Sequence, residues 1–297
     1  RTNTRIYCGI IADNTYLYLG TDNGILVYNY RTDKYEQPDT DFPTDVRTMV
    51  LQGDTLWIGS LNGLYTYQLK SRQLNHFDSK QTGLPHNTIY SIIHTKDNQI
   101  YIGTYNGLCR YVQASGKFEN ILLPVNRGGS NLFVNSLLED TTRQCIWIGM
   151  EGYLFQYNPI TGEMKAIEVF HNNSIKSLAL DGDENLLAGT DNGLYVYQND
   201  KEPLQHIIHD SRNIQSLTNN IIWNIFSDQE HNIWLGTDYG ISLSRYNSAL
   251  QFVPISQITG TGDGNQFYSL FRDSKGFYWF GGTNGVIRFT HPAGNKH

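Results

Sequence analysis

Residues 57–64 read Trp-Ile-Gly-Ser-Leu-Asn-Gly-Leu. The pattern is an aromatic or aliphatic residue, an apolar residue, glycine, a small residue, two variable residues, a second glycine and an apolar residue. It occurs seven times, with its first glycine at Gly20, Gly59, Gly103, Gly149, Gly189, Gly236 and Gly281. Seven copies of a repeat of about 40–45 residues are typical of propeller blades.

Each copy lies among further strand signals. An apolar stretch such as residues 89–93 precedes it, and polar turn residues such as those at 96–98 separate the two. The glycine-containing turn allows the positive φ of a tight hairpin. An alternating third strand (residues 64–67) and a short fourth (residues 118–122) follow. With no helical period of useful length, the repeat predicts an all-β fold, a seven-bladed β-propeller of four-stranded antiparallel blades.

We expect one propeller domain, with blades at about residues 1–42, 43–85, 86–130, 131–171, 172–218, 219–262 and 263–297. In the fourth copy Gly152 comes one position early and Tyr153 takes the usual glycine place, which predicts a hairpin of different shape. The seventh copy lacks an outer strand after Phe289. Because unpaired edge strands are usually covered, we expect either a fragment of a longer protein or an imperfectly closed propeller.

Composition excludes several classes of protein. The 297 residues are 39% hydrophobic and carry a formal charge of −6, without a basic block, which argues against a nucleic-acid partner. No apolar run approaches 18 residues, so no membrane contact is expected from this segment. Cys8, Cys109 and Cys145 form no CxxC pair. We therefore expect buried free thiols, no metal site and no cofactor.

A candidate ligand site follows from aligning the first strand of each blade. The residue after the first apolar position is Tyr7, Arg47, Tyr90, Asn135, Lys176, Trp223 and Tyr268, and Asn87, Asn173, Asn220 and Asn265 stand two places before that position. In a propeller these side chains would surround one mouth of the central channel. Aromatic faces and amides suit a saccharide, and Arg47 and Lys176 would favour an anionic one. The alternative is that the column packs between blades and that the asparagines make turns.

The repeat resembles the two-component regulator propeller repeat, and residues 273–289 match it closely. The resemblance covers nearly the whole chain and is weakest in blades four and five. It implies the periplasmic sensor region of hybrid two-component histidine kinases of glycan-utilising gut bacteria. In that family a second propeller and an immunoglobulin-like domain usually adjoin, and the membrane helix, kinase, receiver and DNA-binding parts would lie outside this chain.

We therefore predict a sensor propeller that detects a carbohydrate breakdown product and signals to a kinase outside the chain. We do not expect the propeller itself to be an enzyme. A second copy of the chain, in a homodimer, is a further candidate partner. One alternative is a protein–protein scaffold that binds no sugar. Another is a carbohydrate-active lyase or sialidase. A sialidase would need a cluster of arginines at the channel mouth, and the column contains only Arg47. The stretch from Asp273 to Trp279 resembles the Asp-box of sialidases, but that box is a structural turn.

Overall fold

The computed structural model describes residues 4–12, 15–38, 40–125, 132–167, 173–199, 204–259 and 264–290. The chain divides into two compact units. One consists of residues 7–178, and the other of residues 1–6 together with residues 179–297.

The first four sheets each run in strand order along the chain. Their strands are β1 (Ile6–Ala12), β2 (Tyr16–Thr21), β3 (Gly24–Asn29), β4 (Lys34–Glu36); β5 (Val46–Gln52), β6 (Thr55–Ser60), β7 (Gly63–Gln68), β8 (Leu74–Phe77); β9 (Ile89–His94), β10 (Ile100–Thr104), β11 (Gly107–Val112), β12 (Lys117–Ile121); and β13 (Val134–Asp140), β14 (Cys145–Met150), β15 (Leu154–Tyr157), β16 (Met164–Ile167). A short helix, α1 (Ser79–Thr82), links the second and third sheets.

Three sheets follow. They comprise β17 (Ile175–Leu180), β18 (Leu186–Thr190), β19 (Gly193–Tyr197), β20 (Gln205–Ile207); β21 (Ile222–Ser227), β22 (Ile233–Thr237), β23 (Ile241–Ser244), β24 (Val253–Pro254); and β25 (Phe267–Arg272), β26 (Phe277–Gly282), β27 (Gly285–Thr290), with helix α2 (Ile255–Thr259) after the sixth sheet. The predicted class, a seven-bladed β-propeller, is confirmed. The seventh blade has three strands in the described part of the chain, as predicted.

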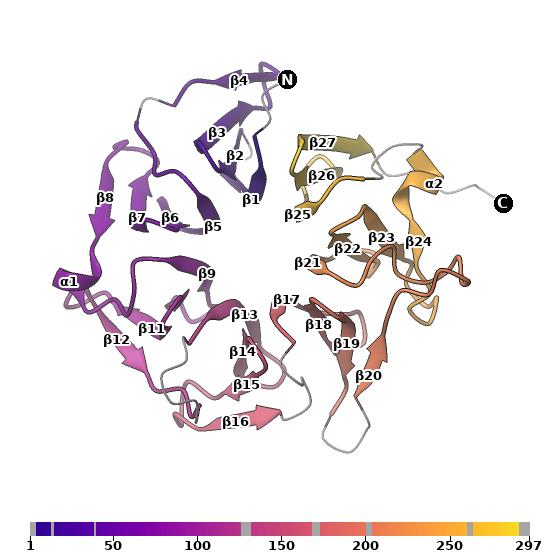
Figure 1. Ribbon diagram of the computed structural model, residues 1–297. Coiled ribbons are helices and arrows are strands. Elements are labelled where there is room, and N and C mark those ends of the chain that lie inside the picture. Colours follow the sequence, from indigo (N-terminus) through magenta and orange to yellow (C-terminus); the bar gives the residue numbers. More distant parts are fainter. Residues whose placement is uncertain are drawn as a thin grey trace. The chain divides into compact units, whose positions relative to one another are not determined.

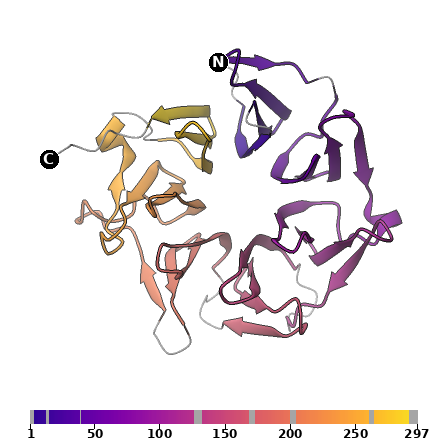
Figure 2. The same ribbon diagram turned by 180° about the vertical axis from the view of Figure 1, so that it is seen from behind.

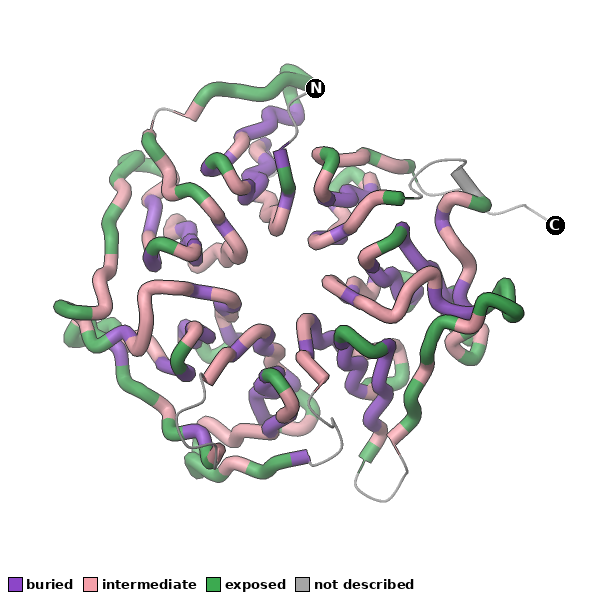
Figure 3. Tube along the Cα trace, in the orientation of Figure 1, coloured by how far each residue is buried: buried purple, intermediate pink, exposed green. Residues whose placement is uncertain are grey.

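Within residues 7–178 the blades share one arrangement. The first strands β5, β9 and β13 lie next to one another, and the fourth strands β8, β12 and β16 lie farther out (Figures 1 and 2). Burial follows the same order, because the second and third strands are mostly buried and the fourth strands mostly exposed (Figure 3). The apolar core therefore lies between the blades.

The first glycine of the repeat allows neighbouring blades to approach. A Cβ atom on Gly59 would lie 2.6 Å from Cγ2 of Ile89, the first apolar residue of the next blade, and 2.6 Å from Cγ2 of Thr48. The same relation recurs at the seventh blade, where a Cβ on Gly281 would lie 2.6 Å from Cγ2 of Ile6. Any larger residue would push such strands apart.

The second glycine serves the hairpin. Gly107 has a φ of 116°, and its carbonyl accepts a hydrogen bond from Thr104 Oγ1 at 2.9 Å, while the same oxygen of Thr104 accepts the Asn106 N–H at 3.1 Å. In the fourth blade the positive φ moves to Gly152 (76°), one position earlier than usual, and Tyr153 is not among the residues with positive φ. The predicted difference in that hairpin is confirmed.

Buried carboxylates secure the turn before the second strand. Asp273 Oδ1 accepts the N–H groups of Lys275 and Phe277, both at 2.9 Å, and its Oδ2 accepts the indole N–H of Trp279 at 2.8 Å. Asp140 and Asp228 accept the indoles of Trp147 and Trp234 in the same way, at 3.0 and 2.8 Å. The Asp-box-like stretch is thus a structural turn.

Candidate functional site

The predicted column lies on a β-bulge that recurs between the first and second strands. The pairing register skips one first-strand residue in at least five blades, and the skipped residues are Arg47, Tyr90, Asn135, Trp223 and Tyr268. A bulge residue has no ladder partner, so its side chain can be turned away from the sheet packing. The column predicted from the sequence therefore coincides with a β-bulge that recurs from blade to blade.

A backbone hydrogen bond beside the bulge recurs as well. The residue after the hairpin threonine or its equivalent donates its N–H to the carbonyl of the residue just before the first strand. The observed pairs are Leu61 to Asp45 (3.2 Å), Tyr105 to Thr88 (2.9 Å), Asp238 to Ile221 (3.0 Å) and Thr283 to Gln266 (3.0 Å). This bond fixes the hairpin against the start of the first strand, and so holds the bulge residue at a defined place.

Five column residues belong to residues 7–178. One of them, Arg47, lies close to both Tyr7 and Asp45. Its Cζ lies 3.7 Å from the centre of the Tyr7 ring, and its Nη2 lies 3.5 Å from Oδ1 of Asp45. Its Nε is buried and has no hydrogen-bond partner among the described residues. Burial raises the pKa of the nearby Tyr90 phenol, and the charge of Arg47 opposes that rise.

An aromatic group that we call the blade-three cluster lies beside Tyr90. The ring of Phe133 lies 6.0 Å from that of Tyr90 and 4.1 Å from that of Tyr105, which in turn lies 5.0 Å from His86. Sequence reasoning missed Phe133, although it directly precedes the first apolar residue of its blade. Tyr105, a residue of the hairpin, thus packs against its own chain.

The other two column residues of this unit are less prominent. Asn135 donates from Nδ2 to Ser174 Oγ at 3.1 Å, which joins the fourth blade to the loop before the fifth. Lys176 follows the buried Ile175 at the start of β17 and is half-buried.

Trp223 and Tyr268 form a second group, in residues 179–297. Their rings meet edge to face with centres 5.4 Å apart. Trp223 Nε1 donates to Asp238 Oδ1 at 3.1 Å, Gln266 Nε2 donates to the same oxygen at 2.6 Å, and the Tyr268 hydroxyl donates to Gln266 Oε1 at 2.6 Å. Asp238 and Gln266 were not predicted as site residues. Their only signal in the sequence is their position, because Asp238 lies in the hairpin and Gln266 directly precedes the first strand.

The four predicted asparagines mainly organise loops. The carbonyls of Asn173, Asn220 and Asn265 accept the hairpin N–H groups of Gly152 (2.8 Å), Gly193 (2.7 Å) and Gly240 (2.9 Å) of the preceding blade. The amide oxygens of Asn87 and Asn220 accept from the backbone of Ser79 (2.8 Å) and His209 (2.7 Å). These contacts favour the turn-making alternative for them.

Asn265 differs from the other asparagines in one respect. Its Oδ1 is buried and accepts no hydrogen bond from the residues that the structure describes. An unsatisfied buried oxygen is uncommon and is a suitable acceptor for a ligand hydroxyl.

The sequence predicts three buried free thiols. All three cysteines are free as expected; Cys109 and Cys145 are buried, whereas Cys8 is only half-buried. Burial raises the pKa of the Cys8 thiol to about 12 and that of Cys145 to about 11. In the described ranges, no three His, Cys, Asp or Glu side chains are grouped to hold a metal ion. No helix in those ranges is long and apolar enough to cross a membrane.

Comparison with known proteins agrees with the repeat. The two component regulator propeller family matches residues 83–106, 216–239 and 261–284. The extracellular domain of a putative hybrid two component system from B. thetaiotaomicron is 82% identical over 99% of this chain, with a TM-score of 0.80, and this chain covers 39% of it. Histidine kinase P4 of Formosa agariphila is 26% identical over 94% of this chain, which covers 22% of that protein.

A streptogramin B lyase shares the fold, with a TM-score of 0.71 and 12% identity over 96% of this chain. At that identity the likeness concerns the fold alone. The chain spans well under half the length of its curated relative and of the extracellular domain. Three of its repeats thus match the two component regulator propeller family, and nearly the whole chain is similar to part of that extracellular domain.

Proposed function

We propose that the chain is the extracellular, periplasmic ligand-sensing propeller of a hybrid two-component regulator. It detects a carbohydrate breakdown product and signals to a histidine kinase outside the chain. The support is the 82% identity to an extracellular domain of such a system and the match to a histidine kinase along 94% of the chain. Both relatives extend far beyond the matched part, which leaves room for a second propeller, an immunoglobulin-like domain and the kinase.

The observation that carries the ligand proposal is the setting of Arg47. Its guanidinium stacks on Tyr7, and its buried Nε has no protein partner in the described residues. A buried charged donor without an acceptor is costly, so an oxygen of a bound ligand would relieve that cost. Because Tyr7 stacks on this guanidinium and Tyr90 lies close enough to be affected by its charge, a saccharide with a carboxylate or a suitably placed hydroxyl fits its chemistry.

Neither alternative gains an observation of this strength. A protein-binding scaffold would present a continuous apolar patch. The most exposed large apolar residues, Leu122, Ile160 and Ile214, belong to three different blades. An enzyme would bring acids together in a pocket, whereas Asp140 and Asp228, whose pKa values are lowered, bind indoles in structural turns. We therefore propose a non-catalytic propeller, with homodimer formation as a possible route for the signal.

Isothermal titration with a panel of neutral and acidic oligosaccharides tests the proposal. We expect binding that Arg47→Ala abolishes and Arg47→Lys weakens, because lysine keeps the charge but loses the stacked planar group. Arg110→Ala is the matched control, since Arg110 pairs with Glu119 on an exposed surface at 2.7 Å. Equal binding by the wild type and Arg47→Ala, or no binding of any sugar, would contradict the ligand proposal.

A further inference from the structure

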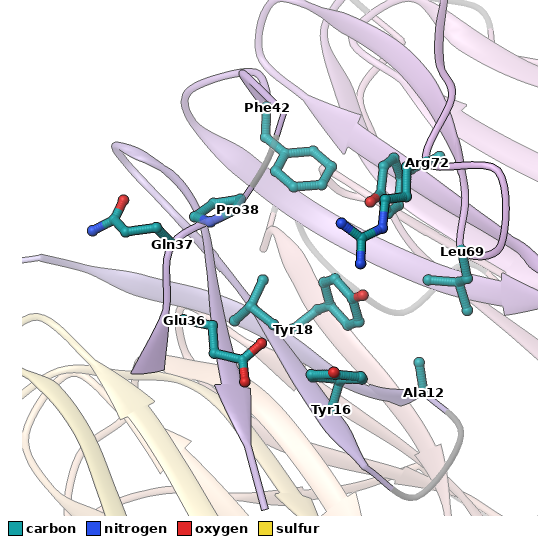
Figure 4. A pocket seen from close by; sticks show the side chains of 11 residues that line it. Ala12, Tyr16, Tyr18, Glu36, Gln37, Pro38, Phe42, Leu69 and Arg72 are labelled. Atoms are coloured by element: carbon teal, nitrogen blue, oxygen red, sulfur yellow. The ribbon is translucent and has the colours of Figure 1, made fainter. Parts of the chain in front are cut away.

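A cavity lies away from the column, between the first and second blades. It has a volume of about 150 Å³. One wall is a row of cross-strand neighbours, Tyr18, Val27 and Glu36, which the register places side by side across β2, β3 and β4. Tyr67 and Arg72 of the second blade form the facing wall. Figure 4 shows the Glu36 carboxylate and the Arg72 guanidinium both turned toward the space around Tyr18.

The first blade has smaller residues than the second blade at two positions beside the cavity. In the second blade Trp57 and Phe77 stack with ring centres 5.9 Å apart, and Tyr111 packs against Trp57 at 4.8 Å. The first blade has Tyr18 at the Trp57 position. Pro38 takes the position of Phe77. Phe77 pairs with Leu64, whose equivalent in the first blade is Ile25. The register of β3 with β4, continued by two residues, sets Ile25 opposite Pro38.

Other blades have a larger residue at the position equivalent to Pro38. The residue opposite the first apolar residue of the third strand is Ile121, Ile167 or Ile207 in the third, fourth and fifth blades. Each is a large apolar side chain that is at least partly buried. The first blade has the smaller Pro38 there, which leaves space beside Tyr18.

The lining of this cavity combines aromatic faces with planar polar groups. Tyr16, Tyr18 and the edge-to-face pair of Phe42 and Tyr67, with ring centres 5.0 Å apart, supply the aromatic surface. Asn29 Nδ2 holds Glu36 Oε1 at 2.6 Å. The backbone of Arg72 is held at the turn between β7 and β8, where its backbone N–H donates to the carbonyl oxygen of Gln68 at 2.8 Å.

These features select a ligand class. One carboxylate and one guanidinium cancel in charge, which favours a neutral ligand. Both groups are planar and can each bond two neighbouring hydroxyls, while aromatic faces accept C–H groups. A cavity of about 150 Å³ holds roughly one six-membered ring.

We propose that this cavity binds one neutral sugar residue, either a monosaccharide or the terminal residue of an oligosaccharide. The site is distinct from the column that contains Arg47. It shares its ligand class with the proposed function but none of its residues, so either proposal can fail while the other stands.

Saturation-transfer difference NMR on the whole chain tests this site, with D-glucose, D-galactose, D-mannose, D-xylose and N-acetyl-D-glucosamine as probes. Two variants, Pro38→Phe and Tyr18→Trp, introduce the larger residues of the second blade and fill the cavity. A third, Glu36→Gln, removes the charge from an exposed position without changing the volume. Asn75→Gln, at the position equivalent to Glu36 in the second blade, is the matched control, and circular dichroism verifies the fold of each variant.

We expect millimolar binding of at least one probe, weakened about tenfold or more by Pro38→Phe and by Glu36→Gln and unchanged by Asn75→Gln. If Pro38→Phe does not fold, Glu36→Gln decides. Binding that only Arg47→Ala abolishes would overturn this site and leave the proposed function intact. The absence of binding by every probe would likewise overturn it.

Discussion

Tyr278 of β26 donates a hydrogen bond from its hydroxyl to Oδ2 of Asp228, just after β21, at 2.8 Å. The same oxygen accepts the Trp234 indole at 2.8 Å and the Asn232 amide at 3.0 Å. The guanidinium of Arg272 lies 5.3 Å from the Tyr278 ring centre. One buried carboxylate therefore fastens the turn of the sixth blade to the second strand of the seventh.

Replacing Tyr278 with phenylalanine tests this link. The variant keeps the ring but removes one donor from a buried carboxylate, so the free energy of unfolding should fall by about 1–3 kcal/mol. Urea denaturation measures the change. Tyr239→Phe, at a side chain that is 54% exposed, is the control and should be neutral. Equal losses in the two variants would show that the bond to Asp228 contributes nothing specific.

Stability should depend on pH through the same carboxylate. Burial disfavours the charged form of Asp228, but the hydrogen bonds from Trp234, Asn232 and Tyr278 outweigh it and hold its pKa below the usual value. A lowered folded-state pKa contributes stability above the unfolded-state value of about 3.9, and that contribution is lost as the pH falls through the folded-state pKa.

The melting temperature should therefore stay nearly constant from about pH 7 to pH 5 and fall below about pH 4. Asp228→Asn should lower stability at neutral pH and flatten the acid limb of the curve. An unchanged acid limb in that variant would assign the loss to other carboxylates, among which Asp140 has the same kind of indole bond and a lowered pKa.

Gly59→Ala should weaken the contact between the second and third blades. The added Cβ would lie 2.6 Å from both Ile89 Cγ2 and Thr48 Cγ2, so the strands must move apart, at a cost of about 1–3 kcal/mol. Thermal unfolding measures the loss. Gly53→Asn is the comparison, because Gly53 has open space around it and a φ of 58° that asparagine tolerates. A neutral Gly59→Ala would refute the close-approach explanation of the repeat.

The thiols should react slowly in the folded protein. Burial raises the pKa of the Cys8 thiol to about 12 and that of Cys145 to about 11, and burial also raises the pKa of Cys109. Since the thiolate is the reactive form, a disulfide reagent at about pH 8 should modify all three only after unfolding. Rapid modification of one thiol in the native protein would show local opening at that strand.

The sequence predicted the blades because the same backbone requirements return in every copy. Gly107 needs a positive φ, and Gly59 needs space for the next blade, so both leave a periodic signal. The bulge at Arg47 could be located only as a column in an alignment of strands. Nothing in the sequence indicated that the guanidinium of Arg47 would stack on Tyr7, since that contact joins two blades.

Features outside the period were harder to predict. The helix α1 is one turn long, and its signals are local, with Asp78 accepting the Lys80 N–H at 2.9 Å and Gly83 ending it at a φ of 83°. The hydrogen bond between Tyr278 and Asp228 joins the seventh blade to the sixth and does not follow from the repeat pattern. The open cavity depends on Pro38, a residue whose meaning appears only when the register of β3 and β4 is known.

The contact between Ile6 and Gly281 has a consequence for the order of folding. These residues stand almost at opposite ends of the sequence, whereas Gly59 and Ile89 make the equivalent contact between neighbouring copies. Contacts between adjacent repeats can form early, because little chain entropy is lost in closing a short loop. The Ile6 contact must wait for nearly the whole chain, so the seventh blade should gain its final protection from hydrogen exchange last.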